Sequence, residues 1–448
     1  MAAGPALAVD GLADSTFGVF SSGRNLIAID QGGLNIDQLA KTLVSDNGTI
    51  FLIGTSGTSG TDSHFSITKV LSNGLVDSTF GNNGTVVGAE STAIAKNARF
   101  DASGNILIAG SVDPSGTDRD FHLCRYNQLG QPVAFSFLGT HCASVSFNIA
   151  GGNKNDVAND LLIEPSGKIL LVGTAGVSSD SDRGAIVRFK PDGSRDGLFG
   201  TSGKRAYSFT ANKINRINAI ARQKSGKYIV VGETGDAASA DGTGAVFARV
   251  TLAGDLDTGF QVGAGFVQFN VNAGSAFNRD EAATEINILP DGSLLMGGTA
   301  ETGTNSAQHM AFVFKLADED SASFDTSFGT IGRLNIEDGY STTLNDLLVQ
   351  SDGKLVLVTS NRPTSASTSV IEVIRARSTG ALDTQTFGNA GRSYISYNLP
   401  GALDYGISGA FQFGHIVVGG YSLNTLPANF DITIARLQND LIFVNGVD

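Results

Sequence analysis

The chain has 448 residues, 41% of them hydrophobic and 16% charged, and a formal net charge of −13. An acidic chain without clustered Lys and Arg lacks the phosphate contacts that nucleic-acid binding requires, so we expect no nucleic-acid partner. No apolar run approaches the ~18 to 20 residues of a membrane-spanning helix, so we also expect no transmembrane segment. The 57 glycines and 27 phenylalanines, with no tryptophan, are typical of a β-protein with many tight turns.

The first residues, MAAGPALAVDG, contain neither the charged region nor the apolar region of a signal peptide. Ala6-Leu7-Ala8 has the small-x-small form of a cleavage junction. We therefore expect a mature exported protein that is secreted, periplasmic or part of the cell envelope.

A turn motif begins near the start of the chain and recurs along it. Its copies are GLADSTFG at 11–18, GLVDSTFGNNG at 74–84, GSRDGLFG at 193–200, GDLDTGF at 254–260, ASFDTSFG at 322–329 and GALDTQTFG at 380–388. The aspartate can accept hydrogen bonds from backbone N–H groups two residues on, and the glycines can adopt positive φ. The phenylalanine is then free to point inward, where burial is worth roughly 1.5 to 3 kcal/mol. We interpret the motif as a fastener that each repeat unit carries.

Apolar strand runs recur between these turns. They begin at Gly48, Gly104, Gly167, Gly226, Gly292, Gly353 and Gly414, roughly sixty residues apart. Each unit is expected to have four strands: a first strand such as 155–164, an apolar second strand, a third strand such as 185–190, and a fourth strand after the turn motif. Four-stranded units repeated radially make a propeller. The sequence therefore predicts an all-β protein, one seven-bladed β-propeller of four-stranded blades that spans residues 1–448.

The third strands share a basic residue, and the turns share an aspartate. The basic residues are Lys69, Arg125, Arg188, Arg249, Lys315, Arg375 and Arg436, and the aspartates are Asp14, Asp77, Asp196, Asp257, Asp325 and Asp383. We predict that the two sets pair within or between neighbouring blades. Groups present in nearly every blade are expected to be scaffold.

The ends of the chain are expected to close the ring. A turn motif and a fourth strand at 20–30 come first with no preceding three strands, and a third strand at 431–437 comes last. Residues 12–30 should therefore supply the outer strand of the blade built from 402–437. Such closure removes an exposed sheet edge.

These motifs resemble those of the bacterial delta-60 repeat β-propellers, whose unit reads approximately DGKIxxxG, then FxxxR, then GxxDxxFGxxG. The resemblance covers nearly the whole chain and implies the fold and export. It supplies no catalytic residues. The second unit departs from the pattern, with PVAFSFLG at 132–139 in place of the DxxFG turn.

Few residues suggest a metal or redox centre. Cys124 and Cys142 are the only cysteines, and their spacing suits one disulfide but neither a zinc site nor a CxxC motif. The five histidines (His64, His122, His141, His309 and His415) show no paired spacing, and we interpret them as polar residues near strand ends. The acidic loops 113–120 and 178–184 are either solvated turns or Ca²⁺ sites. We expect no cofactor, with a structural or channel-bound Ca²⁺ as the alternative.

The candidate ligand site lies on the first strands of the units, which should line the central channel. Counting back seven and eleven residues from the hairpin glycines predicts a cluster at one channel mouth of Asp37, Lys41, Asp156, Asp160, Glu281, Glu285 and Asp346. Paired carboxylates can perform acid/base chemistry, bind a cation or simply face water.

The sequence favours an exported bacterial scaffold, monomeric and non-catalytic, that binds a small molecule, a saccharide or a protein through its loops or channel mouth. The alternative is a hydrolase or lyase that acts on a saccharide or a similar polar substrate at the carboxylate-lined mouth. A purely structural cell-envelope protein is a third hypothesis. Fold alone does not choose among them, and no catalytic residue is assigned.

Overall fold

The computed structural model describes residues 10–19, 22–29, 36–59, 62–114, 116, 118–149, 155–178, 181–211, 213–236, 242–260, 263–271, 280–302, 308–318, 320, 322–364, 368–425 and 429–439. The junction-like residues 6–8 lie outside this part of the chain. Within it, no helix is long and apolar enough to cross a membrane.

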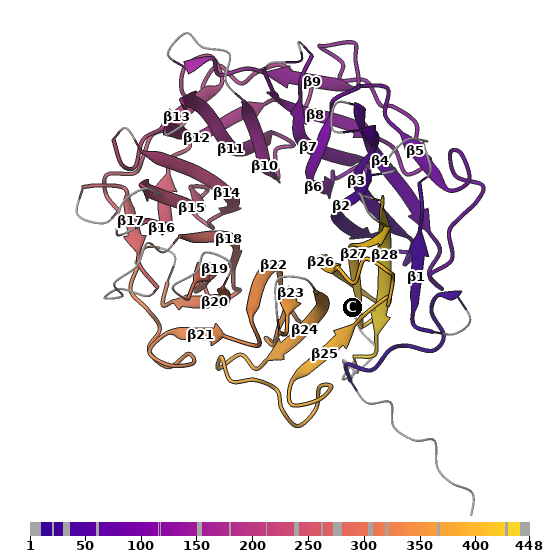
Figure 1. The fold of residues 1–448 in the computed structure, drawn as a ribbon. Coiled ribbons are helices and arrows are strands. Elements are labelled where there is room, and N and C mark those ends of the chain that lie inside the picture. Colours follow the sequence, from indigo (N-terminus) through magenta and orange to yellow (C-terminus); the bar gives the residue numbers. More distant parts are fainter. Residues whose placement is uncertain are drawn as a thin grey trace, which may run out of the picture.

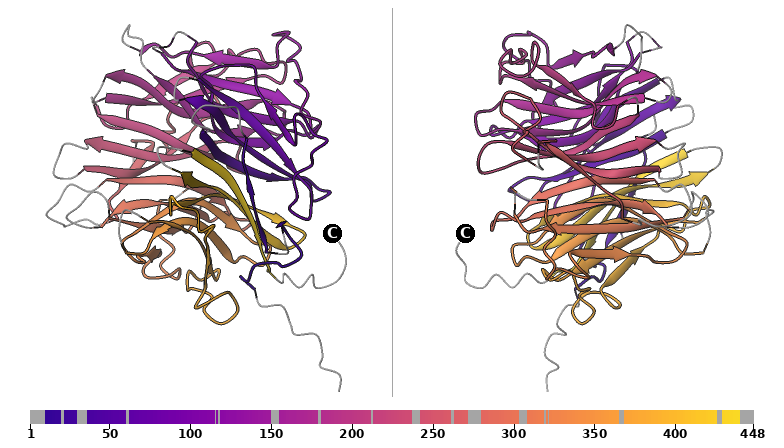
Figure 2. Two further views of the ribbon diagram at one scale, coloured as in Figure 1. Left: turned by 45° about the vertical axis from the view of Figure 1, so that its right-hand side comes forward. Right: turned by 90° about the vertical axis from the view of Figure 1, so that its left-hand side faces the viewer.

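The strands follow one another around a ring in sequence order, and the last strands come to lie beside the first (Figure 1). The two turned views show the sheets side by side around the ring (Figure 2). Strands in the middle of a sheet are buried on both faces, as in β7 (Ile106–Val112), because each sheet is covered by its two neighbours. The core therefore lies between sheets, as where Phe247 and Phe312 share one cluster.

Five sheets contain four antiparallel strands each. The first has β6 (Ile94–Phe100), β7 (Ile106–Val112), β8 (Asp120–Tyr126) and β9 (Cys142–Val145). The second has β10 (Asp156–Ile163), β11 (Ile169–Ser178), β12 (Ser181–Phe189) and β13 (Lys204–Tyr207). The third has β14 (Ile214–Arg222), β15 (Tyr228–Asp236), β16 (Gly242–Val250) and β17 (Phe266–Phe269). The fourth has β18 (Glu281–Ile288), β19 (Leu294–Glu301), β20 (His309–Leu316) and β21 (Arg333–Ile336), and the fifth has β22 (Ser341–Val349), β23 (Leu355–Arg362), β24 (Val370–Ala376) and β25 (Arg392–Ile395).

The remaining strands form one eight-stranded sheet. Its strands are β1 (Arg24–Ile27), β2 (Ile36–Val44), β3 (Ile50–Ser59), β4 (Asp62–Val70), β5 (Thr85–Val87), β26 (Asp404–Gln412), β27 (His415–Thr425) and β28 (Asn429–Leu437). The prediction of seven four-stranded blades is therefore wrong, because five blades have four strands and the other eight strands share one sheet. A parallel bridge between Ile36 and Phe430 joins β2 to β28. The repeat pattern counts units and carries no information about such a bridge between neighbouring units.

The two ends of the chain meet in this eight-stranded sheet. β1 pairs antiparallel with β28, with Arg24 opposite Ala435 and Ile27 opposite Ile432. Just before β1, the backbone N–H of Asp14 donates to the carbonyl oxygen of Arg436 at 2.9 Å. The N-terminal strand therefore covers the edge that β28 would otherwise expose.

The predicted fastener pairs are confirmed in all six units that carry the aspartate. The pairs are Arg436–Asp14, Lys69–Asp77, Arg188–Asp196, Arg249–Asp257, Lys315–Asp325 and Arg375–Asp383, at 2.7 to 3.0 Å. Five of these six aspartates also accept the backbone N–H two residues on, as from Thr16 to Asp14 at 2.9 Å, whereas Asp383 accepts the hydroxyl of Thr386. In the exceptional second unit, Arg125 donates to the carbonyl of Val133 and lies 4.2 Å from the ring centroid of Phe135. A backbone carbonyl there accepts the hydrogen bond that the aspartate takes elsewhere.

The fastener also joins neighbouring units, which explains the glycine at the start of the motif. A Cβ atom on Gly254 would lie 2.9 Å from the ring of Phe199, and one on Gly74 would lie 2.7 Å from the ring of Phe17. Each ring belongs to the preceding turn motif. Both glycines also have positive φ, which disfavours any other residue. The phenylalanine of one motif thus packs on the glycine of the next.

We predict that deleting residues 1–30 lowers the melting temperature by several degrees or more and promotes self-association. The deletion removes β1 and the Asp14 and Phe17 contacts, and it exposes the edge of β28. Differential scanning fluorimetry and size-exclusion chromatography of the full and shortened chains test this. A shortened chain that remains monomeric with an unchanged melting temperature would show that closure by β1 contributes little.

Candidate functional site in the central channel

Each inner strand contains a β-bulge, and together these bulges surround a cavity. β2, β6, β10, β14, β18, β22 and β26 each have a register shift that leaves one residue unpaired with its neighbouring strand. These residues are Ala40, Lys96, Asn159, Asn218, Thr284, Asn345 and Ile407. All of them line a single cavity of about 190 Å³. A β-bulge re-aims a side chain, and here the repeated bulges gather side chains from every inner strand at one place.

The structure brings four of the seven predicted ligand residues together here. Lys41, Asp160 and Glu285 line the cavity. Asp346 is beside them, because its Oδ2 atom lies 2.8 Å from the Nζ atom of Lys41. The predicted cluster is therefore smaller than the sequence suggested.

The other three predicted residues, Asp37, Asp156 and Glu281, do not line the cavity. Each is buried and accepts a backbone N–H from the segment that leads into its strand: from Ile29 to Asp37 at 2.8 Å, from Phe147 to Asp156 at 2.6 Å and from Val271 to Glu281 at 2.6 Å. Asn215 and Asp404 accept equivalent bonds from Thr210 and Tyr397. The prediction that all seven residues gather at one channel mouth is therefore wrong for these three. Their hydrogen bonds hold the segment that connects one sheet to the next.

Asp160 and Asp346 tie neighbouring inner strands together. Asp160 accepts from Asn97 at 2.8 Å and Arg99 at 3.2 Å, and from the backbone N–H of Ile220 on the next inner strand at 3.0 Å. Asp346 accepts from Lys41 at 2.8 Å, from Ser408 at 3.0 Å and from the backbone N–H of Gly409 at 2.9 Å. Both oxygens of each carboxylate are engaged, since Oδ1 of each also accepts the N–H of the following residue.

Glu285 differs from these two carboxylates. In the described part of the chain its side chain makes no hydrogen bond or ion pair, although it lines the cavity and is only partly exposed. Burial in the channel raises the pKa of Glu285 well above its usual value, and Asp346 adds to the rise while Lys41 opposes it. Glu285 is thus the carboxyl group of the cavity that most readily keeps its proton.

Three cations, Lys41, Lys96 and Arg99, line the same cavity as this carboxyl group. Burial lowers the pKa of Lys41, but the negative charges of Asp346 and Glu285 have the larger combined effect, so that the pKa is raised. Asp160 is the main cause of the raised pKa of Arg99. Burial in the channel and the nearby Arg119 lower the pKa of Lys96. The cavity therefore combines fixed ion pairs with one cation, Lys96, that no described carboxylate contacts.

Sequence reasoning missed Lys96, Arg99 and the three channel asparagines. Asn159, Asn218 and Asn345 each donate to a backbone carbonyl on the next inner strand, those of Ile217, Ala283 and Gly406, at 2.7 to 3.0 Å. The sequence did contain a signal for them. Eight residues before the hairpin glycine, successive units carry a polar residue: Lys96, Asn159, Asn218, Thr284 and Asn345. A bulge places that residue beside its neighbour in the channel, whereas a regular strand would point it away.

The described residues of the two acidic loops carry contacts of their own, and residues 115 and 117 of the first loop lie outside the described chain. In loop 113–120, the side chain of Asp113 accepts the backbone N–H of Asp118 at 3.2 Å. Burial raises the pKa of Asp156 to about 6 despite the lowering effect of its two backbone hydrogen bonds, and Asp118 and Asp120 add to the rise. In loop 178–184, whose residues 179 and 180 lie outside the described chain, Asp182 pairs with Arg216 at 2.8 Å. A bound Ca²⁺ stays a prediction.

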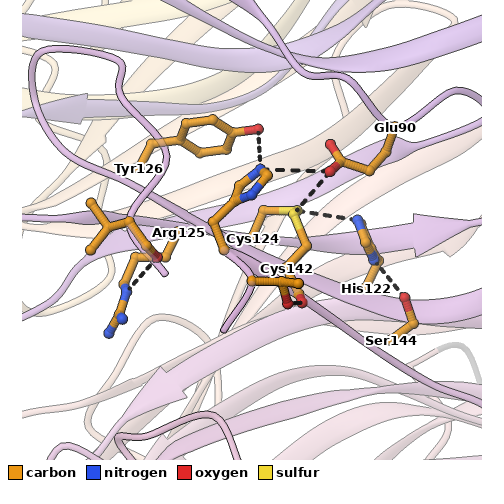
Figure 3. The surroundings of a disulfide bond; sticks show 10 residues. Glu90, His122, Cys124, Arg125, Tyr126, Cys142 and Ser144 are labelled. Atoms are coloured by element: carbon orange, nitrogen blue, oxygen red, sulfur yellow. Dashed lines mark hydrogen bonds and ion pairs between the residues drawn. A yellow bond between two sulfur atoms is a disulfide. The ribbon is translucent and has the colours of Figure 1, made fainter. Parts of the chain in front are cut away.

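The predicted disulfide between Cys124 and Cys142 is confirmed (Figure 3). His122 Nε2 lies 3.1 Å from the sulfur of Cys124, and Glu90 Oε1 lies 3.4 Å from the sulfur of Cys142. Burial lowers the pKa of His122 to about 4, so that its imidazole is neutral near pH 7. His141 lies 3.6 Å from Glu90. The sequence did not indicate that two histidines and a glutamate would surround the disulfide.

We predict that Glu285→Gln raises the melting temperature at pH 8 by about 1 to 2 °C. A carboxyl group whose pKa is higher in the folded than in the unfolded chain contributes stability that is complete below its unfolded pKa. That contribution is lost as the pH rises through the folded pKa. The amide mimics the protonated acid at every pH, so the advantage of the variant should vanish at pH 4.

Scanning fluorimetry between pH 4 and 8 measures this difference. The matched control is Glu337→Gln at an exposed position, where no pH-dependent difference is expected. A Glu285→Gln protein less stable than wild type at pH 8 would show that an ionised Glu285 stabilises the ring through Lys41.

The chain is similar to β-propellers of unassigned and assigned activity. The sequence model of a family described as "Domain of unknown function (DUF5122) beta-propeller" matches residues 164–199 and 223–260, which supports a β-propeller repeat family. No curated protein matches the chain. A protein of unknown function from Dyadobacter fermentans is 12% identical, with a TM-score of 0.45 and coverage of 92% of this chain and 98% of its own.

Several of the similar solved structures carry an enzyme name. The α-L-arabinanase of Penicillium chrysogenum, complexed with arabinobiose, is 11% identical with a TM-score of 0.47, covering 77% of this chain and 93% of its own. The GH93 α-L-arabinofuranosidase of Fusarium graminearum is 11% identical with a TM-score of 0.44, covering 92% of this chain and 97% of its own. Likeness at this level carries no activity over to this chain.

Proposed function

We propose that the protein is an exported bacterial β-propeller that binds, without catalysis, a small anionic group in its central cavity, such as the carboxylate of an acidic saccharide. The observation that carries the proposal is the charge pattern of the cavity. Asp160 and Asp346 are neutralised by Arg99 and Lys41. A protonated Glu285 then leaves the charge of Lys96 uncompensated, so the cavity attracts an anion although the whole chain is acidic.

The donors of the cavity suit such a ligand. Lys41 and Arg99 each have N–H groups beyond those that bind Asp346 and Asp160, and a protonated Glu285 donates its O–H. A channel of low dielectric strengthens these interactions and focuses the local field. The volume of about 190 Å³ is below the ~300 to 1,000 Å³ of drug-sized sites. The cavity therefore fits one small acidic group or a single sugar ring.

A hydrolase or lyase on a saccharide is the second candidate, favoured by the raised pKa of Glu285. A carboxyl group that keeps its proton near neutral pH can act as a general acid. Paired-carboxylate chemistry also needs a second carboxylate that is free to act as base or nucleophile. The oxygens of Asp160 and Asp346 are already engaged by side chains and backbone N–H groups. Binding without catalysis is therefore the stronger proposal.

Export is part of the proposal, and the disulfide between Cys124 and Cys142 supports it. Disulfides form and persist in oxidising compartments and are rare in reducing ones. A secreted, periplasmic or cell-envelope location would also expose the cavity to saccharide fragments outside the cell.

We predict that glucuronate binds and that neutral glucose binds at least 10-fold more weakly, as measured by isothermal titration calorimetry at pH 6. Lys96→Ala should weaken glucuronate binding about 10-fold or more, whereas Lys190→Ala, at an exposed surface position, should leave it unchanged. Wild-type affinity should fall as the pH rises through the pKa of Glu285, because an ionised Glu285 repels the anion. Glu285→Gln should remove that pH dependence.

Equal affinities for glucuronate and glucose, or an unaffected Lys96→Ala variant, would contradict anion binding in the cavity. Cleavage of an acidic oligosaccharide by wild type that Glu285→Gln abolishes would establish the second candidate instead.

A further inference from the structure

The disulfide lies inside a set of potential metal ligands (Figure 3). One ligand atom from each of Glu90, His122, Cys124 and Cys142 lies within 4.8 Å of all the others. In the part of the chain that the structure describes, no other group of three or more His, Cys, Asp and Glu side chains meets this condition. The donor set is two sulfurs, one imidazole nitrogen and one carboxylate oxygen.

The β-sheet positions these ligands without any loop rearrangement. His122 and Cys124 are two residues apart on β8, so their side chains point to the same face of the sheet. On the adjacent strand β9, Cys142 lies opposite Cys124 and Ser144 lies opposite His122. Glu90 lies on the connection that leads from β5 in the eight-stranded sheet to β6 in the sheet of β8 and β9. The cluster therefore joins two sheets.

His122 is oriented as a ligand. Its Nδ1 atom lies 2.9 Å from the hydroxyl oxygen of Ser144, which can accept the Nδ1–H. Its Nε2 atom is directed at Cys124, with a separation of 3.1 Å from the sulfur. Metal-binding histidines use this arrangement, with one ring nitrogen donating to a fixed partner and the other directed at the metal. These two contacts hold the imidazole so that Nε2 faces the sulfurs, where it would face an ion bound to them.

We propose that, when the disulfide is reduced, the protein binds one Zn²⁺ ion through Glu90, His122, Cys124 and Cys142, so that metal binding and disulfide formation exclude each other. Zinc prefers four tetrahedral ligands drawn from cysteine, histidine and carboxylate, with Zn–S near 2.3 Å. Such a site needs its two sulfurs about 3.8 Å apart, as follows from tetrahedral geometry and that bond length. Breaking the S–S bond allows this separation by side-chain rotation.

The exchange balances in electrons and protons. A dithiol reductant transfers two electrons and two protons to the disulfide, which yields two cysteine thiols and the cyclic disulfide of the reductant. Zn²⁺ then displaces the two thiol protons and binds the thiolates. In the reverse direction, a disulfide oxidant accepts two electrons from the two thiolates, the S–S bond forms again and Zn²⁺ leaves.

The cluster is reachable from solvent on one side. The side chain of Glu90 is 24% exposed and that of His141 is 22% exposed, while His122 and Cys124 are buried. Glu90 also lies 3.6 Å from His141, whose Nε2 atom lies 3.3 Å from the hydroxyl of Tyr126. His141 and Tyr126 thus position the carboxylate at the open side of the cluster, where an ion would enter.

The test is titration of the full chain with Zn²⁺, after reduction and in the oxidised state, by isothermal titration calorimetry. The reduced protein is expected to bind one Zn²⁺ per chain, at least 100-fold more tightly than the oxidised protein. His122→Ala and Glu90→Gln should each weaken binding at least 10-fold. The matched control is His309→Ala, because His309 also lies near the start of a strand and contacts a serine, Ser341 at 3.2 Å, while both cysteines of the chain lie in another sheet.

Two further readouts separate the site from adventitious binding. Co²⁺ in the reduced protein should give thiolate-to-cobalt charge-transfer absorption that Cys142→Ser removes. Bound Zn²⁺ should slow reformation of the disulfide by an added disulfide oxidant. The proposal is overturned if the reduced protein binds no Zn²⁺, whether circular dichroism shows it folded or unfolded, or if His122→Ala and Glu90→Gln bind as tightly as wild type.

Discussion

The structure depends on the contact between a third-strand cation, a turn aspartate and the phenylalanine beneath them. Arg188, Arg375 and Arg436 are buried, and a buried guanidinium is destabilising unless it is paired and hydrogen-bonded. Each also reaches the next unit: Arg188 donates to the carbonyl of Leu252 and Arg436 to that of Ser72, both at 2.7 Å. The same contact therefore fixes the turn within a unit and the spacing between units.

The central cavity is a consequence of that spacing. Neighbouring inner strands stand close enough for Asp160 to accept the N–H of Ile220, and for Asn218 to donate to the carbonyl of Ala283. These bonds hold the bulged residues toward the channel. Glu285 is the carboxyl group left outside this network, and its pKa is raised first by burial and then by the negative charge of Asp346. The contacts between the outer turns thus determine the arrangement of the inner strands, and Glu285 is the one carboxyl group of the cavity that differs from the others.

Local and periodic features were predictable from the sequence, whereas features that depend on neighbouring units were not. The pair Arg188–Asp196 repeats with the unit and could be inferred from spacing. The bridge between Ile36 and Phe430 has no repeated pattern, so the sequence implied separate blades where the backbone forms one larger sheet. Asp156 and Asp160 looked equivalent in the sequence, yet the first fastens a connection and the second lines the cavity. The approach of Glu90 to Cys142 depends on the packing of one sheet against another, for which no sequence signal exists.

The central claim is that the fastener, more than any single sheet, stabilises the ring, and Arg436 tests it because it joins the two ends of the chain through Asp14. The measurement is the free energy of unfolding in urea for Arg436→Met, compared with Arg205→Met at an exposed pair with Asp255. The account predicts a loss of about 3 to 5 kcal/mol for Arg436→Met, the cost of breaking a buried ion pair. For the exposed Arg205→Met it predicts a loss of about 1 kcal/mol or less. Similar small losses for both variants would contradict the account.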